Sequence, residues 1–286
     1  MSNDNGVYQV KKTNPIIKPI IYTLLTIWTL INIFPIYWMF TFSLKDNEEI
    51  FGENVAGLPR NWIWENYARA MTGGKMGIYF LNSIIVSTAT IILTLIAAVM
   101  ATYAMSRIVW KGRKLMNKFF MLGLTIPIHS AILPVYMTLK NLHQLNSYQA
   151  LIIPYAAFSL AMAILICMGF MDDIPKELDE AAKIDGCGIW GTFFKVIVPL
   201  MTPALSTIGI YTFLQCWNEL MFANVFNSRT QFKTLPAGIN ELFGTHTTDW
   251  GPIGAALVLA TFPTLLVYVF LSKKIQSSFM AGAIKG

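Results

Sequence analysis

The chain is poor in charge. Only 13% of its 286 residues are Asp, Glu, Lys or Arg, whereas 55% are hydrophobic. A soluble domain of this size carries about twice that charged fraction. The composition therefore excludes an ordinary soluble globular protein and favours one that lies in a membrane.

Recognisable catalytic and nucleotide-binding motifs are missing. No G-x-x-x-x-G-K-[ST] phosphate-binding loop occurs, because the Gly74-Lys75 pair is followed by Met76. Neither H-E-x-x-H nor G-x-S-x-G is present, which removes the usual sequence grounds for a metalloprotease or a serine hydrolase. The three histidines are far apart, at positions 129, 143 and 246. The sequence therefore gives no basis for ATP hydrolysis by this route or for a compact zinc site.

Cysteine is scarce. Cys167, Cys187 and Cys216 are odd in number and widely spaced, and no C-x-x-C pair occurs. Neither a disulfide framework nor a C-x-x-C metal site is supported. We expect these residues to be small apolar fillers.

Long apolar runs dominate the chain instead. Each is about 20 to 27 residues long, which suits a helix that crosses a bilayer. The runs are continuous rather than alternating, and this favours helices over a β-barrel. We predict an all-α integral membrane protein with six transmembrane helices, over residues 17–43, 78–104, 119–139, 149–171, 200–223 and 252–272. Prolines at positions 35, 127, 134, 154 and 263 are then expected to kink helices.

Basic residues indicate the orientation. Residues 107–118 carry five basic side chains and no acidic one, and Lys and Arg are enriched in cytoplasmic loops. Anionic lipid beside this segment accounts for its charge, and we expect no nucleic-acid partner. The prediction is a cytoplasmic segment 1–16, a transmembrane domain 17–272 and a cytoplasmic tail 273–286, in a plasma or inner membrane. The first apolar run is too long for a cleaved signal, so we expect a retained anchor.

A polar segment, residues 172–199, separates the fourth and fifth runs. Pro175 suits a first helical turn, the acidic residues after it favour a helix N-terminus, and Gly186 suits a left-handed end. These features predict a helix over 175–185. Its expected contact face consists of Leu178, Ala181, Ala182 and Asp185. A second short helix should follow, bearing Trp190, Phe193, Phe194 and Val198, before Pro199 and Pro203 open the next span.

The plain alternative is an amphipathic helix that lies on lipid. Such helices carry Lys and Arg on the polar face, whereas residues 172–185 hold six acidic residues and two lysines. Because an anionic membrane surface repels an acidic helix, docking onto another protein is favoured.

This segment resembles the EAA motif of permease subunits of bacterial ATP-binding-cassette (ABC) importers. The motif reads EAA-x3-G-x9-I-x-L-P, and the chain departs from it with Val196 for Ile and Val198 for Leu. Over roughly residues 20–286 the chain resembles the maltose-type carbohydrate subfamily. The segments that carry this likeness include FPIYWMFTFSLKDNEEI, WENYARA, FLNSIIVS, ILPVYMTLKNLHQLNSYQALIIPY, CWNEL, TLPAGI, TDWGPIGAALVLATFP and AGAIKG.

The resemblance implies a transport subunit rather than an enzyme. It implies a six-helix permease bundle with cytoplasmic coupling helices that forms half of a translocation pathway for a mono- or oligosaccharide. The implied partners are a homologous second permease, two ATPase subunits that bind ATP and Mg, an extracellular solute-binding protein and membrane lipid. No cofactor is expected in this chain.

The resemblance also assigns residues to the ATPase interface. The motif glutamate, here Glu180, pairs with the ATPase in such permeases, and Gly186 sets the bend between the coupling helices. The implied coupling set is Glu180, Ala181, Ala182, Asp185, Gly186 and Pro199. The implied ATPase-contacting tail is Gly282, Ala283, Lys285 and Gly286.

A loop of about 28 residues joins the last two predicted spans. A plain surface connector is possible, but loops longer than about 12–15 residues are uncommon unless functional. By resemblance this loop reaches the solute-binding protein, through Thr234, Leu235, Pro236, Gly238, Asp249 and Trp250.

Polar side chains inside spans are functional candidates by default. Trp217, Asn218 and Glu219 combine an aromatic face with an amide and a carboxylate, which suits a sugar ring and its hydroxyls. His129 and Asn82 are further candidates for the substrate path, although His129 also suits a hydrogen bond to a carbonyl freed by a proline. The alternative function is an ion-coupled secondary transporter of a small polar solute, for which Glu219 is the only acid near a span.

Overall fold

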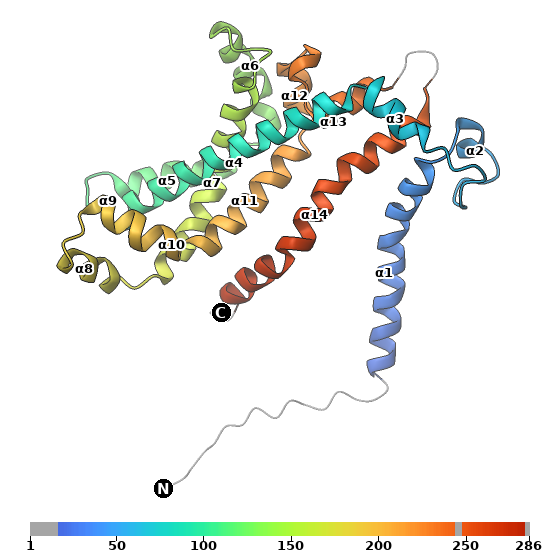
Figure 1. Ribbon diagram of the computed structural model, residues 1–286. Helices are drawn as coiled ribbons and strands as arrows, with labels where there is room; N and C mark the ends of the chain where they lie inside the picture. Colours follow the sequence, from blue (N-terminus) through green and yellow to red (C-terminus); the bar gives the residue numbers. More distant parts are fainter. Residues whose placement is uncertain (1–16, 244–247, 284–286) are drawn as a thin grey trace.

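The computed structural model describes residues 17–243 and 248–283, with side-chain environments up to residue 270 (Figure 1). All regular elements in this part of the chain are helical, which confirms the all-α prediction. Four helices hold an apolar stretch long enough to cross a bilayer. They are α1 (Ile17–Phe42), α4 (Met76–Ser106), α7 (Gln149–Asp173) and α14 (Trp250–Ala283).

Two further spans are sharply bent. The first joins α5 (Arg113–Leu122) and η1 (Gly123–Thr125) to η2 (Ile128–Ala131) and α6 (Ile132–Asn141), with a bend of 96°. The second joins the helical stretch Ile189–Leu200 to α11 (Thr202–Trp217), with a bend of 71°. Counting each bent pair as one span gives six, as the sequence predicted.

The third predicted span, 119–139, is broken rather than kinked. Ile126 is extended, at φ −82° and ψ 118°, because the ring of Pro127 disfavours a helical residue before it. Pro127 also has no N–H to continue the hydrogen-bond ladder. By contrast Pro35, Pro154 and Pro263 lie inside continuous helices.

The fifth predicted span, 200–223, ends early at Trp217. The Asn218 side chain donates a hydrogen bond to the Leu214 carbonyl at 2.9 Å, and so competes with the backbone at this helix end. The Glu219 carboxylate accepts hydrogen bonds from the first backbone N–H groups of a new helix. The chain therefore turns here and begins α12 (Met221–Phe226) instead of extending α11.

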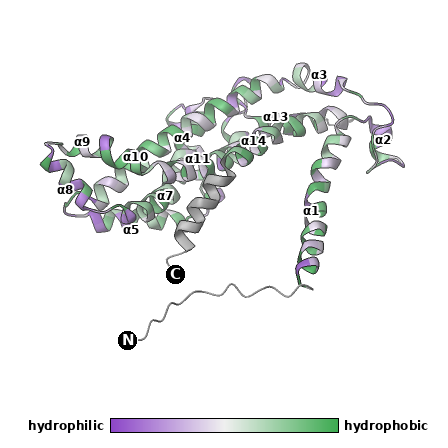
Figure 2. Ribbon diagram, turned by 60° about the horizontal axis from the view of Figure 1, so that its bottom comes forward, coloured by the Kyte–Doolittle hydropathy of each residue, from purple (hydrophilic) through white to green (hydrophobic). Residues whose placement is uncertain are grey.

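The short helices gather at the two ends of the bundle (Figure 1). One end holds α2 (Asn47–Phe51), α3 (Glu65–Thr72), α12, η4 (Thr230–Phe232) and α13 (Leu235–Glu241). The other holds α8 (Glu177–Ile184), α9 (Ile189–Thr192), the π-helical turn η3 (Phe193–Ile197) and α10 (Val198–Leu200). Figure 2 shows apolar residues along the long helices and hydrophilic ones near α2, α5 and α8.

One core cluster joins α4, α7, η3 and α11. Tyr103, Ile197 and Ile208 belong to it and are buried. Cys167 lies in the same cluster, and Cys216 is buried in a neighbouring one, which fits the expected role of small fillers. The part of residues 172–199 that follows α9 is therefore built into the bundle rather than attached to its surface.

Helix α1 stands apart from the other helices (Figure 1). Its large apolar side chains from Ile17 to Ile36 are exposed. At its C-terminal end the Phe42 ring and the Ser43 backbone lie close to Gly254 of α14. Lipid is a favourable environment for such an exposed apolar helix, whereas water is not.

Lys45 holds the loop after α1 in place. Its side chain is buried, and the ammonium donates hydrogen bonds to the backbone oxygens of Asn54 (2.6 Å), Val55 (3.3 Å) and Gly57 (2.8 Å). Burial lowers the pKa of Lys45, and the charge of Glu49 opposes that effect. Buried charge needs such partners, so this loop is fixed by one side chain.

Helix α13 packs closely against the start of α4. The backbone N–H of Leu235 donates to the Ser83 hydroxyl at 2.8 Å, and the Tyr79 hydroxyl donates to Glu241 at 2.9 Å. A Cβ atom on Gly238 would lie 1.9 Å from Cδ2 of the Tyr79 ring. This contact therefore requires glycine.

Replacing Gly238 by alanine should destabilise the protein. Gly238→Ala is expected to lower the free energy of unfolding by about 1–3 kcal/mol, because the added methyl group overpacks the contact with Tyr79. The measurement is the Tm of the purified protein in detergent. In α7, a Cβ on Gly169 would meet nothing within 4 Å, so Gly169→Ala should leave the Tm unchanged or raise it. Equal Tm values for the two variants would contradict the packing described.

Candidate functional site

Helix α8 is defined by signals at both of its ends. Ile174 is extended before Pro175, and the helix begins at Glu177 with an acidic first turn. It ends at Ile184, after which Gly186 has φ +80°. The expected helix over 175–185 is therefore present in a shorter form, and the left-handed glycine is confirmed.

The end of α8 is a Schellman motif. The N–H of Gly186 donates to the carbonyl of Lys183 at 3.0 Å, and that of Cys187 donates to Ala182 at 2.8 Å. A left-handed residue between these bonds reverses the chain, which glycine does without strain. The position of the bend between the two short helices is set in this way.

The two faces of α8 differ from the predicted arrangement. Asp179 and Ala182 are buried against the protein, whereas Glu180, Ala181 and Asp185 are exposed. Ala182 was predicted to share the contact face with Ala181, and the structure corrects this. Because Asp179 and Ala182 are three residues apart, they share the inward side of the helix.

The second short helix runs from α9 through η3 into α10, and Pro199 lies in its last turn. Phe193 and Ile197 face the core, while Trp190 and Phe194 are each 61% exposed. The exposed rings stack on each other, with centroids 6.1 Å apart. Pro199 is exposed and continues this helix, so only Pro203 opens the next span.

Residues 172–199 therefore present a mixed acidic and apolar surface away from the bundle, which we name the coupling surface. Ile184 is 87% exposed and Ile189 57% exposed. Exposed apolar groups beside carboxylates suit a protein partner better than an anionic lipid surface. The members of the coupling surface are Glu180, Ala181, Ile184, Asp185, Ile189, Trp190 and Phe194.

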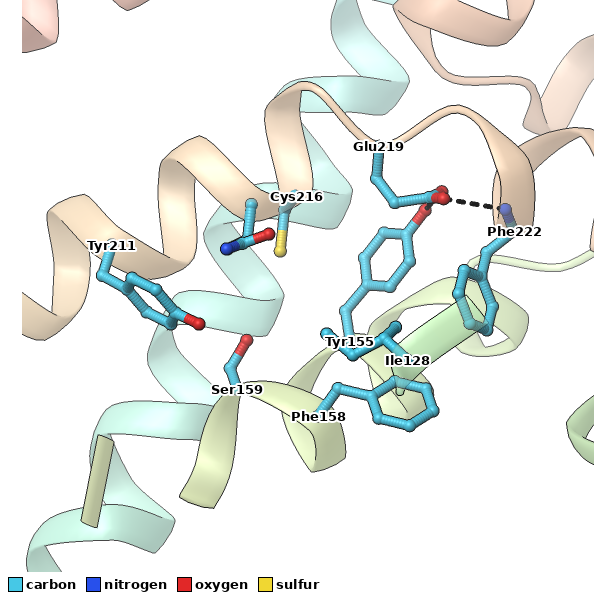
Figure 3. Close-up of a pocket in the computed structure, with 9 residues that line it drawn as sticks. Ile128, Tyr155, Phe158, Ser159, Tyr211, Cys216, Glu219 and Phe222 are labelled. Carbon is cyan, nitrogen blue, oxygen red and sulfur yellow. Dashed lines mark hydrogen bonds between the residues drawn. The ribbon is translucent and has the colours of Figure 1, made fainter. Parts of the chain in front are cut away.

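Glu219 lines a small, mostly apolar cavity between α7 and α11 (Figure 3). Its carboxylate accepts hydrogen bonds from the backbone N–H groups of Phe222 (2.9 Å) and Ala223 (3.1 Å) and from the Tyr155 hydroxyl (2.5 Å). The cavity volume is about 40 Å³, which is room for water rather than for a sugar ring. Its lining is Ile128, Tyr155, Phe158, Ser159, Tyr211, Gln215, Cys216, Glu219 and Phe222.

Trp217 and Asn218 face a different space. They line a cavity of about 380 Å³ that α13 and α14 also border. Trp217 is 3% exposed, and its indole N–H donates to the Ala260 carbonyl at 2.9 Å. The structure thus separates Trp217 and Asn218 from Glu219, although the three are consecutive in sequence.

The side chain of Asn82 forms hydrogen bonds within the protein. Its amide nitrogen donates to the carbonyls of Gln231 and Lys233, both at 2.9 Å, and its oxygen accepts a hydrogen bond from Tyr148 at 2.8 Å. This arrangement favours a structural link between α4, the loop before α13 and α7. His129 is exposed in η2, with its ring centroid 6.1 Å from that of Phe222.

The predicted loop to the binding protein divides into buried and accessible parts. Thr234 and Leu235 are 2% and 1% exposed, and Gly238 packs on Tyr79, so these residues hold α13 in place. Pro236, Asp249 and Trp250 are half-buried.

Two contacts tie the start of α14 to the segment between α1 and α4. Asp249 forms an ion pair with Arg69, and the Trp250 N–H donates to Asn47 at 2.9 Å. Sequence reasoning missed this link because the partners are far apart in the chain.

The predicted ATPase-contacting tail lies only partly within the described residues. Gly282 and Ala283 end the backbone of α14, and Lys285 and Gly286 lie outside the described residues. Within the described residues, no group of three or more His, Cys, Asp or Glu side chains is placed to hold a metal ion.

One buried ion pair was not predicted from the sequence. Arg107 had only been counted as a basic loop residue, but its guanidinium lies 3.0 Å from the buried carboxylate of Asp179 on α8. No spacing pattern joins these two positions, which are distant in sequence. The only available signal was the three-residue spacing of Asp179 and Ala182, which places the two side chains on the same face of α8.

Comparisons with known proteins agree with this geometry. Residues 93–279 match the family model described as binding-protein-dependent transport system inner membrane component. A putative ABC transporter permease of a Caldicellulosiruptor species is 37% identical, over 93% of this chain and 96% of the relative. The diacetylchitobiose uptake system permease NgcG of Streptomyces coelicolor is 34% identical, over 92% and 88%.

Two further matches extend the comparison. The trehalose/maltose transport system permease MalG of Thermococcus litoralis is 34% identical, over 90% of this chain and 93% of the relative. A chain in the crystal structure of a bacterial ABC transporter involved in the import of the acidic polysaccharide alginate has the same fold. Its TM-score is 0.81 at 22% identity, over 92% of this chain and 97% of that one.

The family match covers more than half of the chain, and the relatives match it along nearly its whole length. The chain is an integral membrane protein that belongs to the family of inner-membrane components of binding-protein-dependent transport systems, the permease subunits of ABC importers.

Proposed function

We propose that this chain forms half of the translocation pathway of an ABC importer for a mono- or oligosaccharide and couples to separate ATPase subunits through the coupling surface. The observation that carries the proposal is the two-sided construction of α8 and α9. Their inner sides are buried against the bundle, and their outer sides expose acidic and apolar groups. Such a segment suits the transfer of a partner's movement to the transmembrane helices.

The partners follow from what the chain lacks and exposes. It has no phosphate-binding loop, so two ATPase subunits would bind the ATP and Mg. The exposed α1 and the cavities at the outer end suit a second permease and a solute-binding protein, respectively. With the basic segment 107–118 on the cytoplasmic side, both termini are cytoplasmic.

Carbohydrate as cargo is supported by relatives whose names refer to diacetylchitobiose, trehalose and maltose. The ion-coupled alternative has no such support. It relies on Glu219, and that carboxylate is occupied with the first N–H groups of α12 and with Tyr155. An acid that serves as a helix cap is poorly suited to bind and release an ion.

Reversing the charge of Glu180 should uncouple the transporter. In Glu180→Lys, binding-protein-stimulated ATP hydrolysis and uptake are expected to be lost while membrane abundance stays normal, because an exposed docking group is changed and the core is not. The measurements are ATPase activity of the reconstituted complex and uptake by cells. Asp172→Lys changes an exposed acid before α8 and serves as the matched control. Normal uptake by the Glu180→Lys variant would refute the coupling role.

An accessible apolar residue on the outer loop should affect contact with the binding protein. Phe243 is 47% exposed and packs edge-on against Trp250, with ring centroids 5.6 Å apart. Phe243→Asp is expected to weaken uptake and binding-protein affinity about ten-fold, the loss of a single strong interface residue. Leu142→Asp, at an outer position that is 62% exposed, is the control and should have little effect. Equal affinities for the two variants would exclude this part of the loop from the interface.

A ligand screen on the binding protein tests the cargo. Maltose, trehalose and diacetylchitobiose are the first probes, with amino acids and inorganic ions as competitors from other classes. We expect at least one saccharide to bind saturably. We also expect uptake to survive an uncoupler but to stop when ATP is depleted. Binding of none of the saccharides together with tight binding of an amino acid would overturn the carbohydrate assignment.

A further inference from the structure

Arg107 lies at the C-terminal end of α4, at a point where three helices meet. Its Nη2 group donates hydrogen bonds to the backbone oxygens of Met171 (2.9 Å) and Ile174, at the end of α7. Its Nη1 group lies 3.0 Å from Oδ2 of Asp179 on α8. The two charged side chains are only 6% and 11% exposed.

Electrostatics explains both sets of contacts that Arg107 makes, with the carbonyls at the end of α7 and with the carboxylate of Asp179. The last carbonyls of a helix have no partner within it, and a cation near them is favourable. Arg107 is also the one cation within ion-pair distance of Asp179 in the part of the chain that the structure describes, and neither carboxylate oxygen accepts a hydrogen bond there. Without Arg107 the buried carboxylate would be unpaired, which is costly unless α8 moves to admit water.

A second contact comes from the preceding turn of α4. The Tyr103 hydroxyl lies 3.4 Å from the Ile189 carbonyl, and its ring packs on Phe193 with centroids 5.1 Å apart. Tyr103 and Arg107 are four residues apart and so share one helix face. The last turns of α4 thus contact α9 through Tyr103 and α8 through Arg107.

The core of the bundle holds the second short helix more firmly than it holds α8. The stretch after α9 buries Phe193 and Ile197 in the main core cluster. Helix α8 buries only Asp179 and Ala182 among its own residues. Since alanine offers little area, the ion pair is the principal attachment of α8 to the bundle.

We propose that Arg107 is a positioning residue for energy coupling, which joins α8 to the cytoplasmic ends of α4 and α7 as one rigid unit. Displacement of α8 by an ATPase then moves two transmembrane helices directly, instead of being absorbed by the loop around Gly186. This inference rests on the proposed function of the coupling surface.

Spin-label distances in the complete reconstituted transporter test the rigid unit. One label replaces Lys183 on α8, outside the coupling surface, and the other replaces Asp172 at the end of α7, both exposed positions, in a background without the native cysteines. With Arg107 present, the distance distribution is expected to be narrow and to have the same maximum in the nucleotide-free and vanadate-trapped states. In Asp179→Asn, which keeps the side-chain shape but removes the charge, it should broaden or shift, and likewise in Arg107→Gln.

Two matched variants complete the design. Lys111→Gln removes an exposed charge from the same basic segment and should leave the distribution unchanged. Arg107→Lys keeps the charge but loses the planar fork, and should restore the distribution in part. A narrow, unshifted distribution in Asp179→Asn overturns the proposal, and this variant decides if Arg107→Gln fails to assemble.

A coupling measurement separates this inference from the proposed function. The ratio of stimulated to basal ATP hydrolysis, with binding protein supplied with maltose, trehalose or diacetylchitobiose, should fall about ten-fold in Asp179→Asn, within the usual range of coupling energies. If the unmodified complex is stimulated and Asp179→Asn is stimulated equally, only the inference fails. If Glu180→Lys is also stimulated normally, the proposed coupling surface itself is wrong.

Discussion

Hydrocarbon offers no hydrogen-bond partners, and this constraint determines nearly every feature of the molecule. Backbone groups that cross the bilayer must be satisfied within their own segment, so the spans are helices. Where a span breaks, other groups take over: the Asn218 amide bonds to the end of α11, and Glu219 caps the start of α12. The interruption at Asn218 is thus a place where side chains replace the regular hydrogen-bond ladder.

Buried charge at the ends of the bundle follows the same constraint. Lys45 is enclosed by three loop carbonyls at one end, and Arg107 by two helix-terminal carbonyls and Asp179 at the other. In each case the side chain of a single cation binds several backbone oxygens. Each of these side chains fixes a segment that has little apolar area of its own, the loop after α1 and the helix α8.

Local chemistry made much of the fold predictable. The length of the apolar runs gave six spans, and Gly186 marked the end of α8 because only a left-handed residue closes that motif. The inward face of α8 and the burial of Thr234 and Leu235 were not predictable, because both depend on contacts with α4 that are distant in sequence. The pairing of Arg107 with Asp179 was hidden for the same reason. At Pro127, sequence alone gave no means of telling a kink from a right-angled break.

In a helical bundle, a change on one helix usually alters both the internal packing of the chain and its fit to neighbouring molecules. The isolation of α1 separates these two effects. Since its large side chains from Ile17 to Ile36 add almost nothing to the chain's own interior, changes along this helix leave the remaining packing intact. What such changes alter is the fit to whatever neighbour covers it in the lipid. The first helix can therefore diversify with that neighbour, and new pairings of subunits can arise by drift without remodelling the solute pathway.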